Sequence, residues 1–223
     1  MKSQNNFDVI ILGGGMVGLS IAFQLIKKNI TKNICIIDKE KKLGLHSSGR
    51  NSGVLHAGLY YEPNSLKAKV CVNGSKRLKE WIIERKLTLN NCGKVIVPQD
   101  IYLDSQLDLL KDRGTANGAR VEMWDEKTLK EFIPSARTSS GRALWSPNTS
   151  VVKPIEVINK LKEELIEIGV VFNFGLKSLD FEPLKNKIIL NNESFLHYGY
   201  LFNATGLYAD HIAKLFGVGE KYK

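Results

Sequence analysis

The chain has few cysteines, and nothing in its pattern points to a disulfide framework or a metal site. Cys35, Cys71 and Cys92 are widely spaced, and no C-x-x-C pair occurs among them. The four histidines also lack the spacing of metal ligands. A small disulfide-stapled fold and a zinc module are therefore not predicted, and a reducing cytoplasmic compartment is favoured.

Long apolar segments are also missing, with one deceptive exception. Residues 9–26 form a stretch of 18 residues without a charge. Three consecutive glycines interrupt it and Asp8 precedes it, so we expect neither a membrane span nor a signal sequence.

Acidic residues are outnumbered by basic ones, 23 to 32, which gives a net charge of +9. The 223 residues are otherwise of ordinary globular composition, with 43% hydrophobic and 25% charged. Because the lysines are scattered, a solvated basic surface is favoured. Peripheral contact with an anionic membrane is the main alternative, and nucleic-acid binding is not predicted.

The first forty residues carry the strongest positive signal. An apolar run enters a G-x-G-x-x-G turn with Gly13, Gly15 and Gly18 in its three positions, and a helical pattern follows. A second apolar run then ends at Asp38, 20 residues after Gly18. This order is typical of a dinucleotide-binding β-α-β unit, in which glycines approach the pyrophosphate and the acid binds ribose hydroxyls.

The rest of the chain predicts an interrupted nucleotide-binding domain. We expect an α/β fold whose Rossmann-like domain spans residues 1–90 and 150–223, interrupted by part of an α+β substrate domain at 91–149. The strand-turn signal Ala204-Thr205-Gly206 would return a second backbone stretch to the same nucleotide. Such a detour is more typical of FAD-binding than of NAD-binding domains, so FAD is the favoured cofactor.

Four motifs together resemble the D-amino-acid-oxidase/glycine-oxidase superfamily of FAD-dependent oxidoreductases, and within it the L-2-hydroxyglutarate oxidase/dehydrogenase group. They are the Gly13–Gly18 fingerprint, Ser48-Gly-Arg-Asn-Ser-Gly-Val-Leu-His-Ala-Gly-Leu-Tyr-Tyr61, Ser65-Leu-Lys-Ala-Lys69 and Asn203-Ala-Thr-Gly-Leu-Tyr-Ala-Asp210. The likeness is to the N-terminal part of such enzymes. We therefore expect a truncated reading frame, a split enzyme completed by a second chain, or a non-catalytic FAD-binding fragment.

The fingerprint and the resemblance together indicate a set of cofactor-binding residues. Ser47 to Ser52 match the segment that runs along the pyrophosphate and ribityl chain in this superfamily, and Arg50 would neutralise phosphate charge. Lys39 is expected beside the adenosine, and the backbone near Lys177 and Ser178 beside the adenine. An ordinary polar loop and a plain strand-to-helix turn are the alternatives. The predicted cofactor-binding set is Gly13, Gly15, Gly18, Asp38, Lys39, Ser47, Ser48, Arg50, Asn51, Ser52, Ala204, Thr205 and Gly206.

His56 is the foremost catalytic candidate. Imidazole can take the hydroxyl proton of a 2-hydroxy acid while a hydride leaves C2 for flavin N5. A covalent tether to FAD and a structural role in packing are the alternatives for this histidine. Tyr60 and Tyr61 would orient a substrate carboxylate or pack in the core.

The resemblance implies the oxidation of L-2-hydroxyglutarate to 2-oxoglutarate, with electrons passing to oxygen or to a membrane quinone. An amino-acid, amine or glycerol-3-phosphate oxidoreductase of the same superfamily is the main alternative. The expected location is the cytoplasm. Peripheral binding to the inner face of the cytoplasmic membrane is the alternative.

Overall fold

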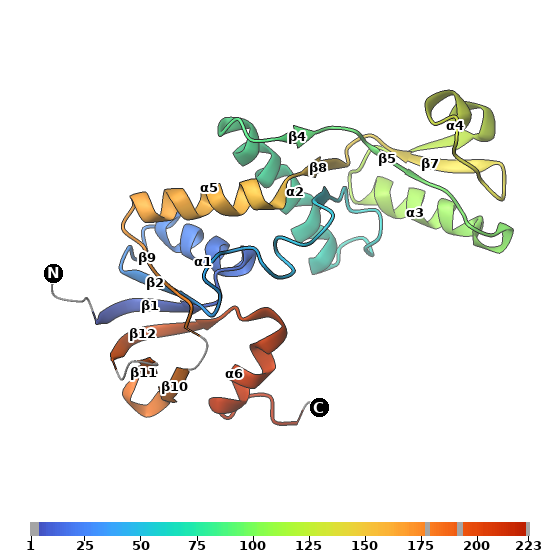
Figure 1. Ribbon diagram of the computed structural model, residues 1–223. Helices are drawn as coiled ribbons and strands as arrows, with labels where there is room; N and C mark the ends of the chain where they lie inside the picture. Colours follow the sequence, from blue (N-terminus) through green and yellow to red (C-terminus); the bar gives the residue numbers. More distant parts are fainter. Residues whose placement is uncertain (1–4, 177–178, 191–193, 222–223) are drawn as a thin grey trace. The chain divides into compact units, whose positions relative to one another are not determined.

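The computed structural model describes residues 5–176, 179–190 and 194–221 (Figure 1). The chain divides into two compact units. The first contains the chain up to Asn51 and again from Pro154 onward, and the second contains Ser52–Lys153.

The first unit is an α/β fold. Its elements are β1 (Asn6–Leu12), α1 (Met16–Lys27), β2 (Ile34–Asp38), α5 (Pro154–Glu167), β9 (Val171–Phe174), β10 (Leu179–Glu182), the 3-10 turn η2 (Pro183–Lys185), β11 (Lys187–Leu190), β12 (Phe195–Asn203), the 3-10 turn η3 (Gly206–Tyr208) and α6 (Ala209–Leu215).

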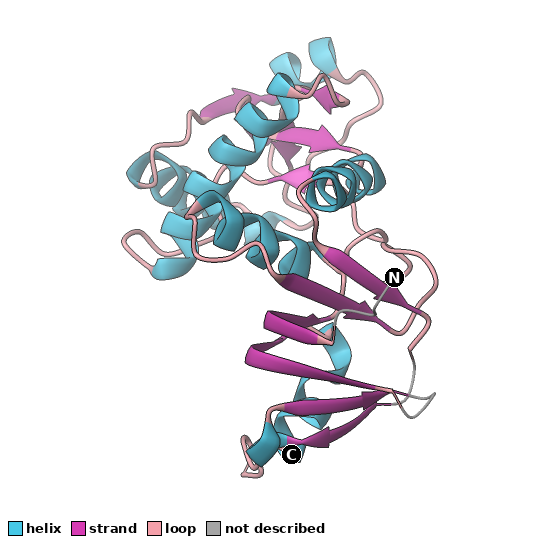
Figure 2. Ribbon diagram, turned by 90° about the vertical axis from the view of Figure 1, so that its left-hand side faces the viewer, coloured by secondary structure: helices cyan, strands magenta, loops and turns pink. Residues whose placement is uncertain are grey.

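A six-stranded sheet with the order β10-β11-β12-β1-β2-β9 organises this unit, and its twist is visible in Figure 2. Strands β9, β2, β1 and β12 are parallel, whereas β10 and β11 pair antiparallel at one side. In chain order the parallel strands therefore run 3-2-1-4, the order of a Rossmann-like half. The strand order reverses between β1 and β12, which is where such sheets bind ligands.

Both faces of the central strands are covered, which explains their continuous apolar sequence. Helices α1 and α5 lie on one face, and α6 lies on the other (Figure 1). Phe181 of β10 and Ile188 of β11 join the core cluster of the central strands. Ile10 and Ile36 are fully buried, as is Cys35, whose thiol pKa burial raises to about 12. Cys35 is thus a buried part of the core, as its place in an apolar run predicts.

Helix α1 turns an unexpected face to the sheet. The spacing of Val17, Ile21 and Leu25 suggests one apolar stripe, but the buried residues of α1 are Gly18, Leu19 and Ala22. Val17 is 64% exposed. The reason is that Gly18 must face the turn after β1, which brings its own side of the helix onto the sheet.

No described helix is long and apolar enough to cross a bilayer, and residues 9–26 are divided between β1 and α1.

The second unit is built of short antiparallel strands and helices. Its elements are β3 (Val54–Leu55), α2 (Leu66–Glu84), β4 (Leu89–Asn90), β5 (Lys94–Ile96), the 3-10 turn η1 (Ile101–Leu103), α3 (Ser105–Ala116), β6 (Glu122–Asp125), α4 (Glu126–Phe132), β7 (Arg142–Ser146) and β8 (Ser150–Val152).

Two three-stranded sheets, β3-β8-β4 and β5-β7-β6, form its framework. One core cluster centres on Leu59, Leu107 and Leu144, and a second centres on Trp124 and Leu129. Helix α2 runs without a break through the Asn73-Gly74 pair, because its exposed surface there tolerates glycine.

The compact units do not divide where the sequence suggested. We expected the first domain to extend to residue 90 and to resume at 150, with 91–149 inserted. The divisions instead follow Asn51 and Lys153. The reason is pairing: β3 and β4 both form ladders with β8, and α2 packs on β4, so residues 52–90 join the second unit.

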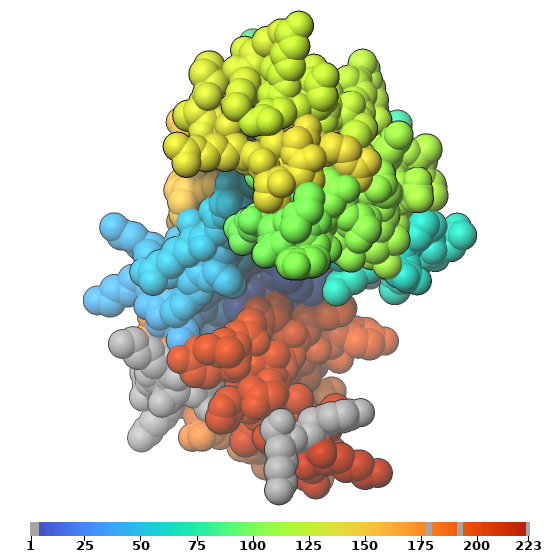
Figure 3. Space-filling model, turned by 90° about the vertical axis from the view of Figure 1, so that its right-hand side faces the viewer, coloured from blue at the N-terminus to red at the C-terminus, as the bar shows by residue number. Residues whose placement is uncertain are grey.

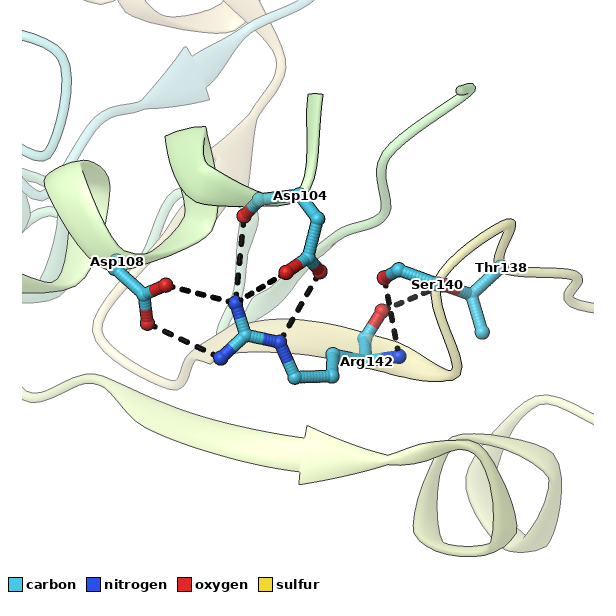
Figure 4. A network of polar contacts seen from close by, with 5 residues as sticks. All are labelled: Asp104, Asp108, Thr138, Ser140 and Arg142. Carbon is cyan, nitrogen blue, oxygen red and sulfur yellow. Dashed lines mark hydrogen bonds and ion pairs between the residues drawn. The ribbon is translucent and has the colours of Figure 1, made fainter. Parts of the chain in front are cut away.

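An arginine ties α3 to the β5-β7-β6 sheet (Figure 4). The Arg142 guanidinium donates from Nη2 to the Asp104 carboxylate at 2.7 Å and to the Asp108 carboxylate at 2.8 Å. These hydrogen bonds lower the pKa of both carboxyl groups. Ser140 and Thr138 hold the strand end, bonding the Arg142 backbone N–H and carbonyl respectively.

We predict that Arg142→Leu lowers the melting temperature at pH 7 and that the difference disappears in acid. The pKa values of Asp104 and Asp108 are lower in the folded state than in the unfolded state, where the pKa of aspartate is about 3.9. Their ion pairs with Arg142 therefore stabilise the fold above that pH, and this stabilisation is lost as the pH falls through the folded-state pKa values. Thermal unfolding followed by circular dichroism from pH 7 to pH 3 measures this. Arg137→Leu, at an exposed arginine, is the control. An equal difference at every pH would contradict the prediction.

Candidate functional site

The turn after β1 needs glycine at two of its fingerprint positions. Gly13 has φ +101°, and a Cβ there would lie 2.3 Å from the Ala204 carbonyl oxygen. A Cβ on Gly18 would lie 2.0 Å from the Gly13 carbonyl oxygen. Both contacts involve backbone atoms, which cannot move aside. Gly13 therefore joins β1 to β12, and Gly18 joins α1 to the end of β1.

Asp38 holds the same turn from the end of β2. Its Oδ2 accepts a hydrogen bond from the Gly14 N–H at 2.8 Å, and its Oδ1 accepts one from the Glu40 N–H at 2.8 Å. A carboxylate oxygen has more than one acceptor position, so both atoms can still accept from a ligand hydroxyl. Asp38 thus both shapes the glycine turn and offers acceptors beside it.

Ser48 reaches the start of α1 from the loop that follows β2. Its hydroxyl oxygen accepts from the Met16 N–H at 3.0 Å, and a Cβ on Gly15 would lie 2.9 Å from that same oxygen. Gly15, the N-cap, has no side chain to cap the helix, and the first turn carries no acidic residue. The positive end of the helix dipole is therefore not neutralised by a charge within the helix.

The other predicted residues of this loop have different surroundings. Asn51 braces the loop, since its side-chain amide donates to the Ser47 carbonyl at 3.0 Å and the Ser48 carbonyl at 2.9 Å. The side chains of Ser47 and Arg50 are exposed. Ser52 is also exposed, and it is the first residue of the second unit.

The turn after β12 lies against the glycine turn. The Ala204 N–H donates to the Leu12 carbonyl at 2.8 Å, which continues the β1–β12 ladder into the turn. Asn203 organises it: its Oδ1 accepts from the Thr205 hydroxyl at 2.7 Å, and its amide donates to the Ala209 carbonyl at 2.7 Å. Gly206 then takes a left-handed conformation, with φ +61°. Asn203 is absent from the predicted site residues, although it belongs to a quoted motif.

Lys39 links the ends of β2 and β12. Its ammonium lies over the Tyr208 ring, 3.9 Å from the centroid, and 3.9 Å from a carboxylate oxygen of Glu40. Figure 3 shows the loop after β2, in light blue, beside the segment after β12, in red. Tyr208 is a second residue that the site prediction omits. The expected adenine contact at Lys177 and Ser178 lies outside the described residues.

These groups fit a dinucleotide. The carboxyl ends of β1, β2 and β12 bring together a glycine turn, a helix N-terminus without an acidic residue in its first turn, a carboxylate and two hydroxyl groups, those of Ser48 and Thr205. Backbone N–H groups at a helix start suit a pyrophosphate, and acceptors at the next strand end suit ribose hydroxyls. Gly13, Gly15, Gly18, Asp38, Lys39, Ser48, Ala204 and Thr205 gather at this one edge.

The predicted catalytic residues lie in the second unit. His56 follows β3, and its ring makes an edge-on contact with Tyr60, with centroids 5.9 Å apart and planes at 85°. Partial burial lowers the pKa of His56 below 6.5, and the nearby Lys94 ammonium lowers it further. Tyr61 contacts a different lysine, Lys67, whose ammonium lies 5.5 Å from its ring centroid.

Lys94 is a member of this group that the sequence did not single out. Its ammonium donates a hydrogen bond to the Tyr60 hydroxyl and lies 4.5 Å from the centroid of the same ring. His56, Tyr60 and Lys94 therefore form one cluster.

Among the residues that the structure describes, no group of histidine, cysteine and carboxylate side chains could hold a metal ion.

Comparison with known proteins places the chain in a family context. The model of the DAO family, described as FAD dependent oxidoreductase, matches residues 8–222. Mitochondrial L-2-hydroxyglutarate dehydrogenase of Nematostella vectensis is 32% identical, over 99% of this chain and 52% of that protein. The Homo sapiens enzyme of the same name is also 32% identical, over 96% of this chain and 49% of that protein. The chain thus spans about half the length of the curated relatives it matches.

Solved structures show the same fold. L-alpha-glycerophosphate oxidase from Mycoplasma pneumoniae, with FAD bound, superposes with a TM-score of 0.79 at 23% identity, over 94% of this chain and 56% of that one. Glycine oxidase from Geobacillus kaustophilus gives a TM-score of 0.82 at 17% identity, over 96% and 59% of the two chains.

We predict that Gly13→Ala destabilises the first unit, because alanine disfavours the positive φ and its methyl group would meet the Ala204 carbonyl. We expect a loss of about 1–3 kcal/mol or more in the free energy of unfolding. Urea unfolding measures it. Gly74→Ala is the matched control: the helix position is open, so we expect a gain of about 0.5–1 kcal/mol. Equal stability of Gly13→Ala and wild type would contradict the packing described here.

Proposed function

The chain belongs to the DAO family of FAD-dependent oxidoreductases, and on this premise we propose that its first unit binds FAD at the joined ends of β1, β2 and β12. The observation that carries this proposal is the backbone contact of Gly13 with Ala204, which brings two polar turns to one edge of the sheet.

Each group at that edge has a role in this proposal. The start of α1 and the Ser48 hydroxyl would face the pyrophosphate, with Gly15 allowing close approach. Asp38 would accept from the adenosine ribose, and Lys39, held over Tyr208, would lie beside the adenosine. The exposed Arg50 would neutralise phosphate charge. FAD, when bound, supplies the acceptor for the two electrons of the reaction.

We propose that the substrate is a 2-hydroxy acid, with L-2-hydroxyglutarate as the first candidate. The names of the curated relatives support this choice. His56 would act as the base: its lowered pKa keeps the imidazole neutral at pH 7, so it can accept the proton of the substrate hydroxyl. Tyr60, Tyr61 and the groups around them would orient the substrate.

Electron acceptor and partners are further parts of the proposal. Oxygen and a membrane quinone are the two acceptors considered, and the net charge of +9 would favour an anionic membrane surface for the second.

Val17, Ile21 and Phe202 line an open apolar groove of about 510 Å³ along α1. We propose that this groove is covered by polypeptide equivalent to the other half of the relatives, from the same or a second chain.

We predict that the purified chain takes up FAD and that anaerobic L-2-hydroxyglutarate bleaches the flavin absorbance. Glycerol-3-phosphate, glycine and L-proline, tested in parallel, should leave it unchanged. Bound flavin that L-2-hydroxyglutarate does not bleach would overturn the proposed reaction for this chain while leaving FAD binding in place. A chain that binds no FAD would overturn both.

We predict that His56→Gln slows bleaching about 10²–10⁴-fold, because glutamine cannot accept the proton. In the wild type the rate should fall as pH drops through the His56 pKa, which lies below 6.5, and the variant should lack this acid limb. His46→Gln is the control, since His46 is exposed and bonds Glu40. An unchanged rate in His56→Gln would show that another group is the base.

A further inference from the structure

The position of Lys94 is fixed by the fold of the second unit. Its strand β5 pairs with β7, which places Lys94 opposite Ser146 and Ile96 opposite Leu144. Lys94 and Ile96 lie on the same face of β5, because strand residues alternate. Ile96, Ala57 and Leu59 pack in one core cluster. This shared core holds β5 beside the segment that carries His56 and Tyr60.

The cluster has an unusual charge balance. Lys94 is half-buried, yet among the described residues no carboxylate lies within ion-pair distance of its ammonium. Its described polar neighbours are the Tyr60 hydroxyl, to which it donates, and the His56 imidazole, whose pKa is lowered by burial and further by the Lys94 charge. A half-buried cation without a carboxylate partner among the described residues leaves a place for an anion from outside the protein.

The hydrogen-bond directions favour an anion in the same way. A lysine ammonium has three donors and no acceptor, so the Tyr60 oxygen must accept from Lys94. The Tyr60 proton then points elsewhere and is free to donate, as are the other N–H groups of the ammonium. Tyr60 is 40% exposed, so this donor set is within reach of a ligand. Two convergent donors, one of them charged, suit a carboxylate.

We propose that Lys94 and Tyr60 form a carboxylate-binding site beside His56 that holds one carboxylate of the organic-acid substrate. This inference rests on the proposed function for its choice of substrate. Lys94 would bind the carboxylate by charge, and the Tyr60 hydroxyl would donate to its second oxygen. The neighbouring His56 would then face the hydroxyl-bearing carbon. Lys94 is thus assigned as a specificity-determining residue.

The test is calorimetric titration of 2-oxoglutarate into the full chain with FAD added. We expect Lys94→Met to weaken binding about tenfold to a hundredfold, and Tyr60→Phe to weaken it about two- to tenfold. Lys94→Arg should recover most of the affinity. Lys76→Met, at an exposed lysine of α2, is the matched control and should bind as the wild type does. The uncharged dimethyl ester of 2-oxoglutarate should bind weakly and equally to wild type and Lys94→Met.

Several results would overturn the inference. They are unchanged affinity in Lys94→Met, an equal loss in Lys76→Met, equal binding of the acid and the ester by the wild type, or no binding of 2-oxoglutarate. Unchanged affinity in Tyr60→Phe would overturn the role assigned to Tyr60. Circular dichroism checks that each variant is folded. If Lys94→Met does not fold, the affinity of Lys94→Arg for 2-oxoglutarate decides the test. Lys94-dependent binding without bleaching by L-2-hydroxyglutarate would support this site and overturn the proposed reaction. Bleaching with normal binding in Lys94→Met would overturn this site alone.

Discussion

The first unit depends on a contact between backbone atoms at the carboxyl end of β1. Gly13 lies against the Ala204 carbonyl, and Gly18 lies against the Gly13 carbonyl, at distances that leave no room for a Cβ. One strand end thereby meets both the following helix and the returning strand β12. The Asp38 and Ser48 side chains then bond the same turn and the helix start. The groups that we propose bind the cofactor are neighbours because of this contact.

The same constraint explains the exposed apolar surface of α1. With Gly18 turned to the sheet, Leu19 and Ala22 are buried with it, and Val17 and Ile21 are left to line the groove beside Phe202. A helix that is apolar on opposite sides normally has both sides covered, which is the basis of the proposal that further polypeptide covers this groove. In strand β12 the described ladder with β11 ends at His197, the Tyr198 N–H bonds the Asn186 carbonyl, and the following residues pair with β1.

Local signals in the sequence predicted the first unit well and the second unit less well. The β1-α1-β2 unit and the turn that brings Ala204 back to it depend on neighbouring residues, and the structure confirms both. The second unit depends on pairing between distant segments. Strand β8 draws residues 52–90 into it, and Lys94 meets Tyr60 across 34 residues of chain. A single lysine at the start of a short strand carries no local sign of such a partner.

The measurement that tests the account most directly is ³¹P NMR of FAD in the presence of the full chain. If the joined ends of β1, β2 and β12 bind the pyrophosphate, its resonances will shift and broaden with the wild type, and will stay at the free position with Gly13→Ala. Pyrophosphate resonances that the wild type leaves unchanged at saturating protein would contradict the account. So would an equal shift in Gly13→Ala, because the site would then not depend on the contact between Gly13 and Ala204.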